Sequence, residues 1–213
     1  MQTLGTLVTN SIINCHAVGL DSIMLKPSPN MLRIFVVREN HTLWRNNPDT
    51  DEPWSIGLHP HHCDITMVPI HGRITNIVLG TTGPQKKLHQ FEYRTGIVNR
   101  VGAFKSAKQS GFGYVNKDVR VVLKHEPLRF PQFMAAKQMH SVYVPKGQRA
   151  AWLICEGREW PEYQPVTLSN HRLDKDYSAV AEDLYKPMTM ARLTEYGEWL
   201  GVYLPGINNR AVS

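Results

Sequence analysis

The apolar residues of this chain are divided into short runs by glycine, proline and charged clusters, and this division limits what the chain can fold into. The 213 residues include 15 glycines and 14 prolines, so long helices are not expected before the C-terminal fifth. Several runs are rich in β-branched and aromatic residues, as strands are: residues 31–38, 65–70, 74–79, 119–123, 142–144 and 151–155. No helical pattern of sufficient length lies between them, so the sequence predicts a mainly β chain, folded as a sandwich or barrel.

The spacing of apolar residues changes near the C-terminus. Leu193, Tyr196 and Leu200 recur at helical spacing within residues 190–200, and a second helix is predicted over residues 178–184, with Pro187 between the two. We therefore expect a β-barrel domain over residues 1–170 and a helical extension over residues 171–213, packed on the barrel or on a partner subunit. The second arrangement predicts a homo-oligomer.

The cysteines and the N-terminal segment bear on the compartment. Cys15, Cys63 and Cys155 form no Cys-x-x-Cys pair, and their odd number speaks against a closed set of disulfides. The first 14 residues lack the basic and apolar regions of a secretory signal, and the longest purely apolar run, residues 150–155, is too short to cross a bilayer. These features predict a cytoplasmic protein that does not span a membrane.

The net charge of +6 is concentrated in one part of the chain. Eleven basic residues face three acidic ones between Lys86 and Lys137, and residues 95–113 look like a long loop. Such a segment favours a small anionic partner, although a solubilising surface has the same composition. Nucleic-acid binding is the weaker alternative, because no recognition-helix pattern accompanies the charge. The candidate anion ligands are Arg94, Arg100, Lys105 and Lys108.

The densest group of potential metal ligands lies in residues 59–64, His-Pro-His-His-Cys-Asp. On an extended backbone His59, His61 and Cys63 point one way, while His62 and Asp64 point the other. A His-x-His pair suits iron(II), manganese or zinc, because two imidazoles leave coordination positions open for a substrate.

A third metal ligand has to come from elsewhere in the chain, and His140 is the first candidate, with His71 and His41 behind it. His62 and Asp64 are candidates for ligand binding, and Asp64 also suits a hydrogen-bond acceptor. The alternative for the whole group is structural: imidazoles hydrogen-bonded at the entrance of a strand.

The histidine pattern resembles the first motif of the cupin superfamily, in which a His-x-His pair precedes an acid and a closing glycine. Gly57, His59, His61 and Gly72 match it, and Pro145-Lys146-Gly147 matches the hairpin of the second motif. The resemblance spans residues 32–156. This chain departs from the pattern in two places: the acid position falls at Ile65 or Thr66, and the histidine position of the second motif falls at Ala150.

The resemblance implies a cupin-like jelly-roll barrel with C-terminal helices that binds a small anionic metabolite. A nucleotide-like compound is one candidate for this metabolite. A divalent transition metal at His59 and His61 then supplies the catalysis. The alternative is a non-catalytic module, without metal, that sequesters or senses a ligand or binds another protein. The histidines favour the first function, and the missing acid and second-motif histidine favour the other, so the sequence leaves open whether the protein is an enzyme.

Overall fold

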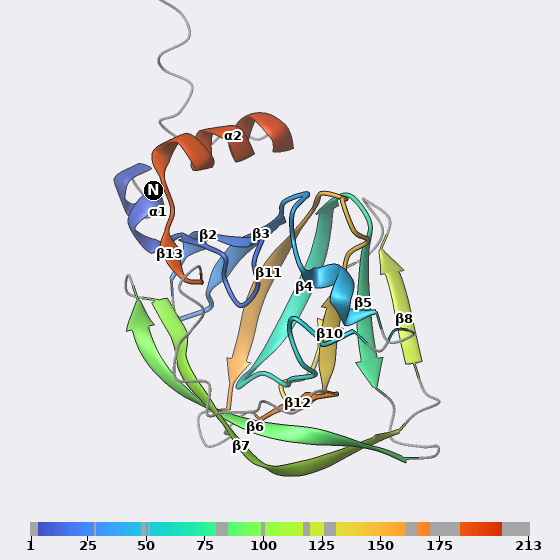
Figure 1. Cartoon of the computed structure of the whole chain (residues 1–213). Coiled ribbons are helices and arrows are strands. Elements are labelled where there is room, and N and C mark those ends of the chain that lie inside the picture. Colours follow the sequence, from blue (N-terminus) through green and yellow to red (C-terminus); the bar gives the residue numbers. More distant parts are fainter. Residues whose placement is uncertain are drawn as a thin grey trace, which may run out of the picture.

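The computed structural model describes residues 4–27, 29–47, 50, 52–79, 85–98, 101–116, 120–125, 131–160, 166–170 and 184–201. In these residues the strands form three antiparallel sheets (Figure 1). The largest sheet has seven strands, in the order β13 (Lys186–Pro187), β1 (Ile12–Ile13), β2 (Leu20–Lys26), β3 (Leu32–Val37), β11 (Ala150–Glu159), β4 (Cys63–His71) and β9 (Gln132–Met134).

Two three-stranded sheets accompany the large one. One has the order β10 (His140–Tyr143), β5 (Ile74–Leu79) and β8 (Arg120–His125), and the other the order β12 (Thr167–Ser169), β6 (Gln85–Val98) and β7 (Val101–Asn116). The described helices are α1 (Leu4–Asn10), the 3-10 helix η1 (Leu43–Asn46) and α2 (Met190–Leu200). The prediction of a mainly β fold with a C-terminal helix is confirmed.

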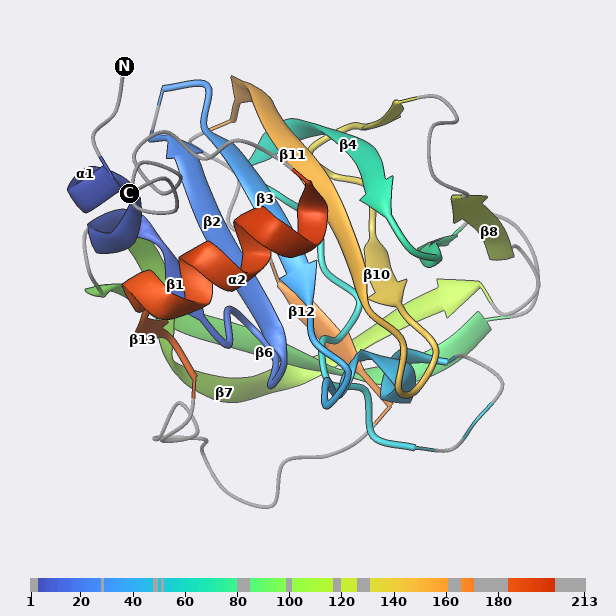
Figure 2. The same cartoon turned by 90° about the horizontal axis from the view of Figure 1, so that it is seen from above.

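The large sheet carries a buried apolar cluster on each of its faces, because successive side chains of a strand point to opposite faces. On the inner face Cys63, Ile65 and Met67 of β4 join Trp152 of β11 in a buried cluster. The outer face packs against α2, which lies across β2, β3 and β11 in Figure 2. The residues of that second cluster include Ile23, Val36, Ala151, Leu193 and Tyr196.

Two tight turns lie at the end of the β4–β11 pairing, one after β4 and one before β11. Gly72, after β4, has a φ of +70°, and a Cβ there would lie 2.2 Å from the backbone oxygen of Arg149, so only glycine fits. In the turn between β10 and β11 the Gln148 nitrogen donates to the Pro145 oxygen at 3.1 Å, and Gly147 has a φ of +75°. The glycines that the sequence pattern places in hairpins therefore lie in turns.

Helix α2 begins at Thr189, whose Oγ1 accepts a hydrogen bond from the Arg192 nitrogen at 3.2 Å, and ends at Gly201 with a φ of +62°. The helix predicted over 178–184 falls mainly outside the described residues, and Leu184 is not helical. The division into two domains stays a prediction. No helix in the described ranges is long and apolar enough to cross a membrane.

The predicted loop over residues 95–113 is wrong. Residues Val101–Asn116 form β7, which pairs with β6 along its length and gives the long ribbon below the other sheets in Figure 1. Glycine, serine and lysine have low strand propensity, so the strand rests on its pairing with a partner. Arg94, Lys105 and Lys108 lie on this ribbon; the positions of their side chains, and all of Arg100, are outside what the structure describes.

Candidate metal centre

Two distant segments bring three histidines together. His59 precedes β4, and its backbone exchanges two hydrogen bonds with that of His140, the first residue of β10, at 2.9 and 3.0 Å. The His61 nitrogen donates to the Ala136 oxygen at 2.7 Å, which holds the second histidine beside the turn that precedes β10. One ligand atom from each imidazole lies within 4.8 Å of the others.

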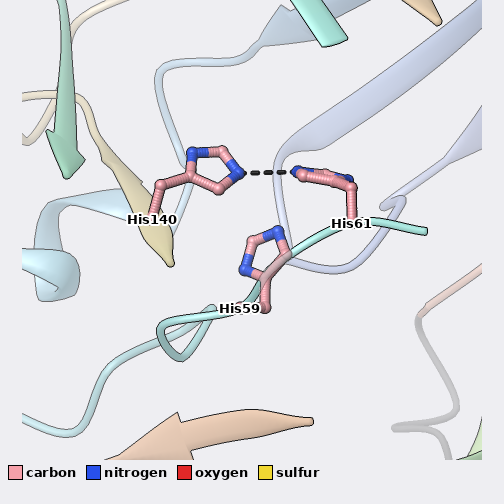
Figure 3. A group of neighbouring side chains, drawn as sticks. All are labelled: His59, His61 and His140. Atoms are coloured by element: carbon pink, nitrogen blue, oxygen red, sulfur yellow. Dashed lines mark hydrogen bonds between the residues drawn. The ribbon is translucent and has the colours of Figure 1, made fainter. Parts of the chain in front are cut away.

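The three rings face one another (Figure 3). Their centroids are 4.7 to 5.1 Å apart, and Nε2 of His61 lies 2.7 Å from Nε2 of His140. The expectation that His59 and His61 point the same way agrees with this geometry, and His140 comes from the side opposite them. Nitrogen atoms bound to one metal ion are close neighbours of this kind, because each lies about 2 Å from the ion.

Hydrogen bonds on the far side of two rings set which nitrogen carries the proton. His59 Nδ1 lies 2.9 Å from the Gly57 oxygen, and His140 Nδ1 lies 2.8 Å from Oδ1 of Asn76. Both partners are oxygen acceptors, so both Nδ1 atoms donate. The Nε2 atoms of His59 and His140 therefore carry lone pairs, and that of His140 accepts a hydrogen bond from Nε2 of His61 (Figure 3). Oxygen acceptors behind the ring hold metal-ligating histidines in the same way.

Asn76 is itself held in place. This residue of β5 is fully buried, and its Nδ2 donates to Oε1 of Gln132 at 3.1 Å and to the sulfur of Met134 at 2.9 Å. The amide oxygen is thereby turned toward His140. Sequence reasoning missed Asn76; the available signal was a polar residue in the middle of the apolar run 74–79.

Burial keeps the three imidazoles neutral. The pKa of His59 is lowered below its ordinary value of 6.5 by burial, which the hydrogen bond to Gly57 partly offsets. The pKa values of His61 and His140 lie well below 6.5, mainly through burial and further because a protonated imidazole there would be repelled by a protonated His59. Only a neutral imidazole binds a metal, so this state is the competent one. His140 is buried, whereas His59 and His61 keep some solvent exposure.

The remaining residues of the predicted cluster lie elsewhere. Cys63 is buried in the core of the inner face. Asp64 Oδ1 accepts a hydrogen bond from the Ala136 nitrogen at 2.9 Å, which suits the acceptor considered from the sequence. His62 is exposed, and its backbone oxygen accepts from the Trp160 nitrogen at 2.6 Å.

The other candidates for a third ligand have structural contacts. His41 Nε2 donates to the Pro145 oxygen at 3.1 Å, and His71 packs on the ring of Trp199, 4.5 Å between centroids. The acid position of the first cupin motif falls at Ile65, which is buried, or Thr66, which is half-buried, and the histidine position of the second falls at Ala150, which is buried. Within the described residues, the donor group around His59 thus consists of three imidazoles and no carboxylate.

Comparison with known proteins does not assign a family. No family model and no curated protein matches the chain. Among solved structures, the polyketide cyclase RemF from Streptomyces resistomycificus is similar with a TM-score of 0.38 and 12% identity over 86% of this chain and 89% of that one. Fe(II)-HppE with the alternative substrate (S)-1-HPP has a TM-score of 0.33 and 11% identity over 65% of this chain and 49% of its own. Membership of the cupin superfamily stays a prediction.

Proposed function

We propose that His59, His61 and His140 bind one divalent transition metal ion, and that a small ligand binds at this centre. The observation that supports the proposal is the pair of acceptors behind the rings: the Gly57 oxygen and Asn76 Oδ1 engage the Nδ1 protons, so the Nε2 lone pairs converge. Three neutral nitrogen donors fit a borderline cation.

The donor set narrows the choice of metal. Imidazoles without a carboxylate suit zinc and iron(II) better than manganese, which prefers oxygen ligands. Such an ion supplies Lewis acidity to a ligand on an open coordination position. The chain contributes the three donors, and Gly57 and Asn76 fix the proton on the far side of two of them.

A second candidate function is ligand sequestration or sensing at the same centre. It is favoured by the donor group itself, which among the described residues contains no carboxylate that could act as a general base beside the metal. In both functions the centre binds a metal ion and a small ligand; only in a catalytic function is the ligand converted to a product.

Metal analysis tests the proposal. Purified protein is stripped with a chelator, incubated with zinc or iron(II), desalted and analysed by inductively coupled plasma mass spectrometry. We expect about one ion per chain, and its loss in His61→Ala and in His140→Ala, while His62→Ala retains it as the matched control. Folded wild-type protein that takes up no metal, or variants that bind it as the wild type does, would contradict the proposal.

A further inference from the structure

The three imidazoles of the centre are not held in the same way. Oxygen acceptors lie behind the rings of His59 and His140, at 2.9 and 2.8 Å. The ring of His61 has no such acceptor among the described residues, and its hydrogen bond there is the one to His140. The position of the His61 ring therefore depends on how its backbone is anchored.

The backbone of His61 is anchored on Ala136, a buried residue of the turn between β9 and β10. The His61 nitrogen donates to the Ala136 oxygen at 2.7 Å. A hydrogen bond from the Gln138 nitrogen to the Ala135 oxygen, at 2.9 Å, closes the turn, which then leads to His140 at the start of β10. A displacement of Ala136 therefore affects two of the three imidazoles.

Asp64 holds the other backbone group of Ala136. Its Oδ1 accepts a hydrogen bond from the Ala136 nitrogen at 2.9 Å. A carboxylate acceptor makes the stronger, charge-assisted kind of hydrogen bond. Because Ala136 is buried, removal of this acceptor leaves its N–H without a partner, which is unfavourable. The carboxylate of Asp64 therefore stabilises the turn in the place where His61 meets it.

His61 and Asp64 together enclose Ala136 in a small ring. The chain from His61 to Asp64 closes through two hydrogen bonds, one to the Ala136 oxygen and one from the Ala136 nitrogen. The regular pairing of β4 with β9 ends at Ile65 and Met134, so these two bonds continue the contact beyond the last paired residues. A side chain thus takes over the role of the strand where the sheet ends.

Asp64 does not belong to the donor group itself, which among the described residues consists of the three imidazoles. Its neighbours Cys63 and Ile65 lie in the buried cluster of the inner face. Side chains alternate along β4, so Asp64 lies on the opposite face, where it is half-buried. The contact of Asp64 with the centre therefore runs through Ala136.

We propose that Asp64 is a positioning residue of the histidine centre: by holding Ala136 it fixes the backbone of His61 and so sets the metal affinity. Loss of a group that supports a metal ligand typically lowers metal affinity about 10- to 100-fold. This inference rests on the proposed function for the presence of the metal. It gives the acid beside the His-x-His pair a role other than that of a ligand.

Zinc affinity, measured by competition with a chromogenic chelator, tests the role of Asp64. The proteins compared are the wild type, Asp64→Ala, Asp64→Asn and Thr189→Ala. Asp64→Ala removes the acceptor, whereas Asp64→Asn keeps an oxygen that can accept the same hydrogen bond. Thr189→Ala is the matched control, because it also removes a side-chain acceptor of a backbone N–H, that of Arg192 at the start of α2.

We expect Asp64→Ala to bind zinc about tenfold or more weakly than the wild type, the lower end of the effect of such supporting groups. Asp64→Asn should stay within about threefold, because its neutral hydrogen bond loses only part of the strength, and Thr189→Ala should bind as the wild type does. A folded Asp64→Ala with wild-type affinity overturns the inference, and so does an equal loss in Asp64→Asn, which a carboxylate bound to the metal itself would give. If Asp64→Ala does not fold, Asp64→Glu replaces it, since it keeps the charge and displaces the oxygens by a methylene group; wild-type affinity there overturns the inference as well.

Amide hydrogen exchange in the metal-free protein, followed by NMR, separates the two proposals. In Asp64→Ala the His61 amide should exchange faster than in the wild type, while the Leu193 amide, which donates to the Thr189 oxygen at 3.1 Å in α2, should exchange at the same rate. If the wild type takes up no zinc, the proposed function fails, and the exchange alone decides whether Asp64 positions His61. If zinc binds and neither its affinity nor the His61 exchange responds to Asp64→Ala, only the inference about Asp64 fails.

Discussion

Asn76→Leu is the substitution that most directly tests how the histidine centre is built. Leucine has a similar volume but removes the acceptor of His140 Nδ1 and the two donations to Gln132 and Met134. At about 0.5–1.5 kcal/mol for each hydrogen bond, the metal-free protein should lose roughly 2–4 kcal/mol of unfolding free energy. Loss of the oxygen acceptor behind a metal-ligating imidazole typically lowers metal affinity about 10- to 100-fold.

Asn46→Leu provides a matched control for stability. Asn46 is also fully buried, and its side chain makes three hydrogen bonds: it donates to the Val142 oxygen at 2.7 Å and accepts from the nitrogens of Ser55 and Ile56. None of these three bonds involves His140, so Asn46→Leu should cost similar stability and leave the metal affinity unchanged. Urea denaturation and competition with a chromogenic chelator measure the two quantities. Equal zinc affinities in Asn76→Leu and the wild type would refute the reasoning.

Three further predictions concern the fold. In metal-free protein, His16, His41, His59, His61 and His140 have pKa values below 6.5 in the folded state, so below about pH 6.5 each of them takes up a proton when the protein unfolds. The free energy of unfolding should therefore fall as the pH is lowered, by up to ~1.4 kcal/mol per pH unit for each histidine. Equal urea midpoints at pH 7 and 5.5 would contradict this prediction. Tyr196→Phe removes a buried hydrogen bond to the Asp21 carboxylate and should lower the free energy of unfolding, measured by urea denaturation, by about 1.5–3 kcal/mol. A loss of less than about 0.5 kcal/mol would speak against that bond. Leu193, on α2, is fully buried against the large sheet, so Leu193→Ala should cost about 2–5 kcal/mol of unfolding free energy, and Met190→Ala, on the exposed side of the helix, little. Equal losses would mean that α2 does not pack as described.

The strands that could be predicted are those whose own residues favour an extended backbone. Residues 74–79 and 32–37 form strands in the apolar runs where they were expected. The ribbon of β6 and β7 could not be predicted in the same way, because its glycine, serine and lysine content is typical of loops and its pairing is between segments. Helix α1 was missed as well; it is only seven residues long.

The candidate site divides along the same line. His59 and His61 point in the same direction because side chains two residues apart lie on the same side of an extended chain, and this spacing can be read directly from the sequence. The meeting with His140 depends on a backbone bridge between residues 81 positions apart, which no local pattern encodes. Asn76 was visible only as a polar residue in an apolar run, and that signal does not tell which face of a strand becomes the inside.

The missing acid of the first motif does not by itself argue against a metal. The acid position falls at a buried isoleucine, Ile65, or a half-buried threonine, Thr66, and the histidine position at a buried alanine, Ala150, so none of these residues offers a carboxylate or an imidazole. His140 comes from β10, which pairs with β5, and its Nδ1 proton is donated to Asn76. Its Nε2 is therefore a nitrogen donor, which the residues at the two motif positions cannot supply. Replacing a carboxylate by an imidazole leaves the centre more positive, because a neutral ligand takes the place of an anionic one. A centre of that charge favours an anionic ligand, because the anion neutralises the excess positive charge of the metal.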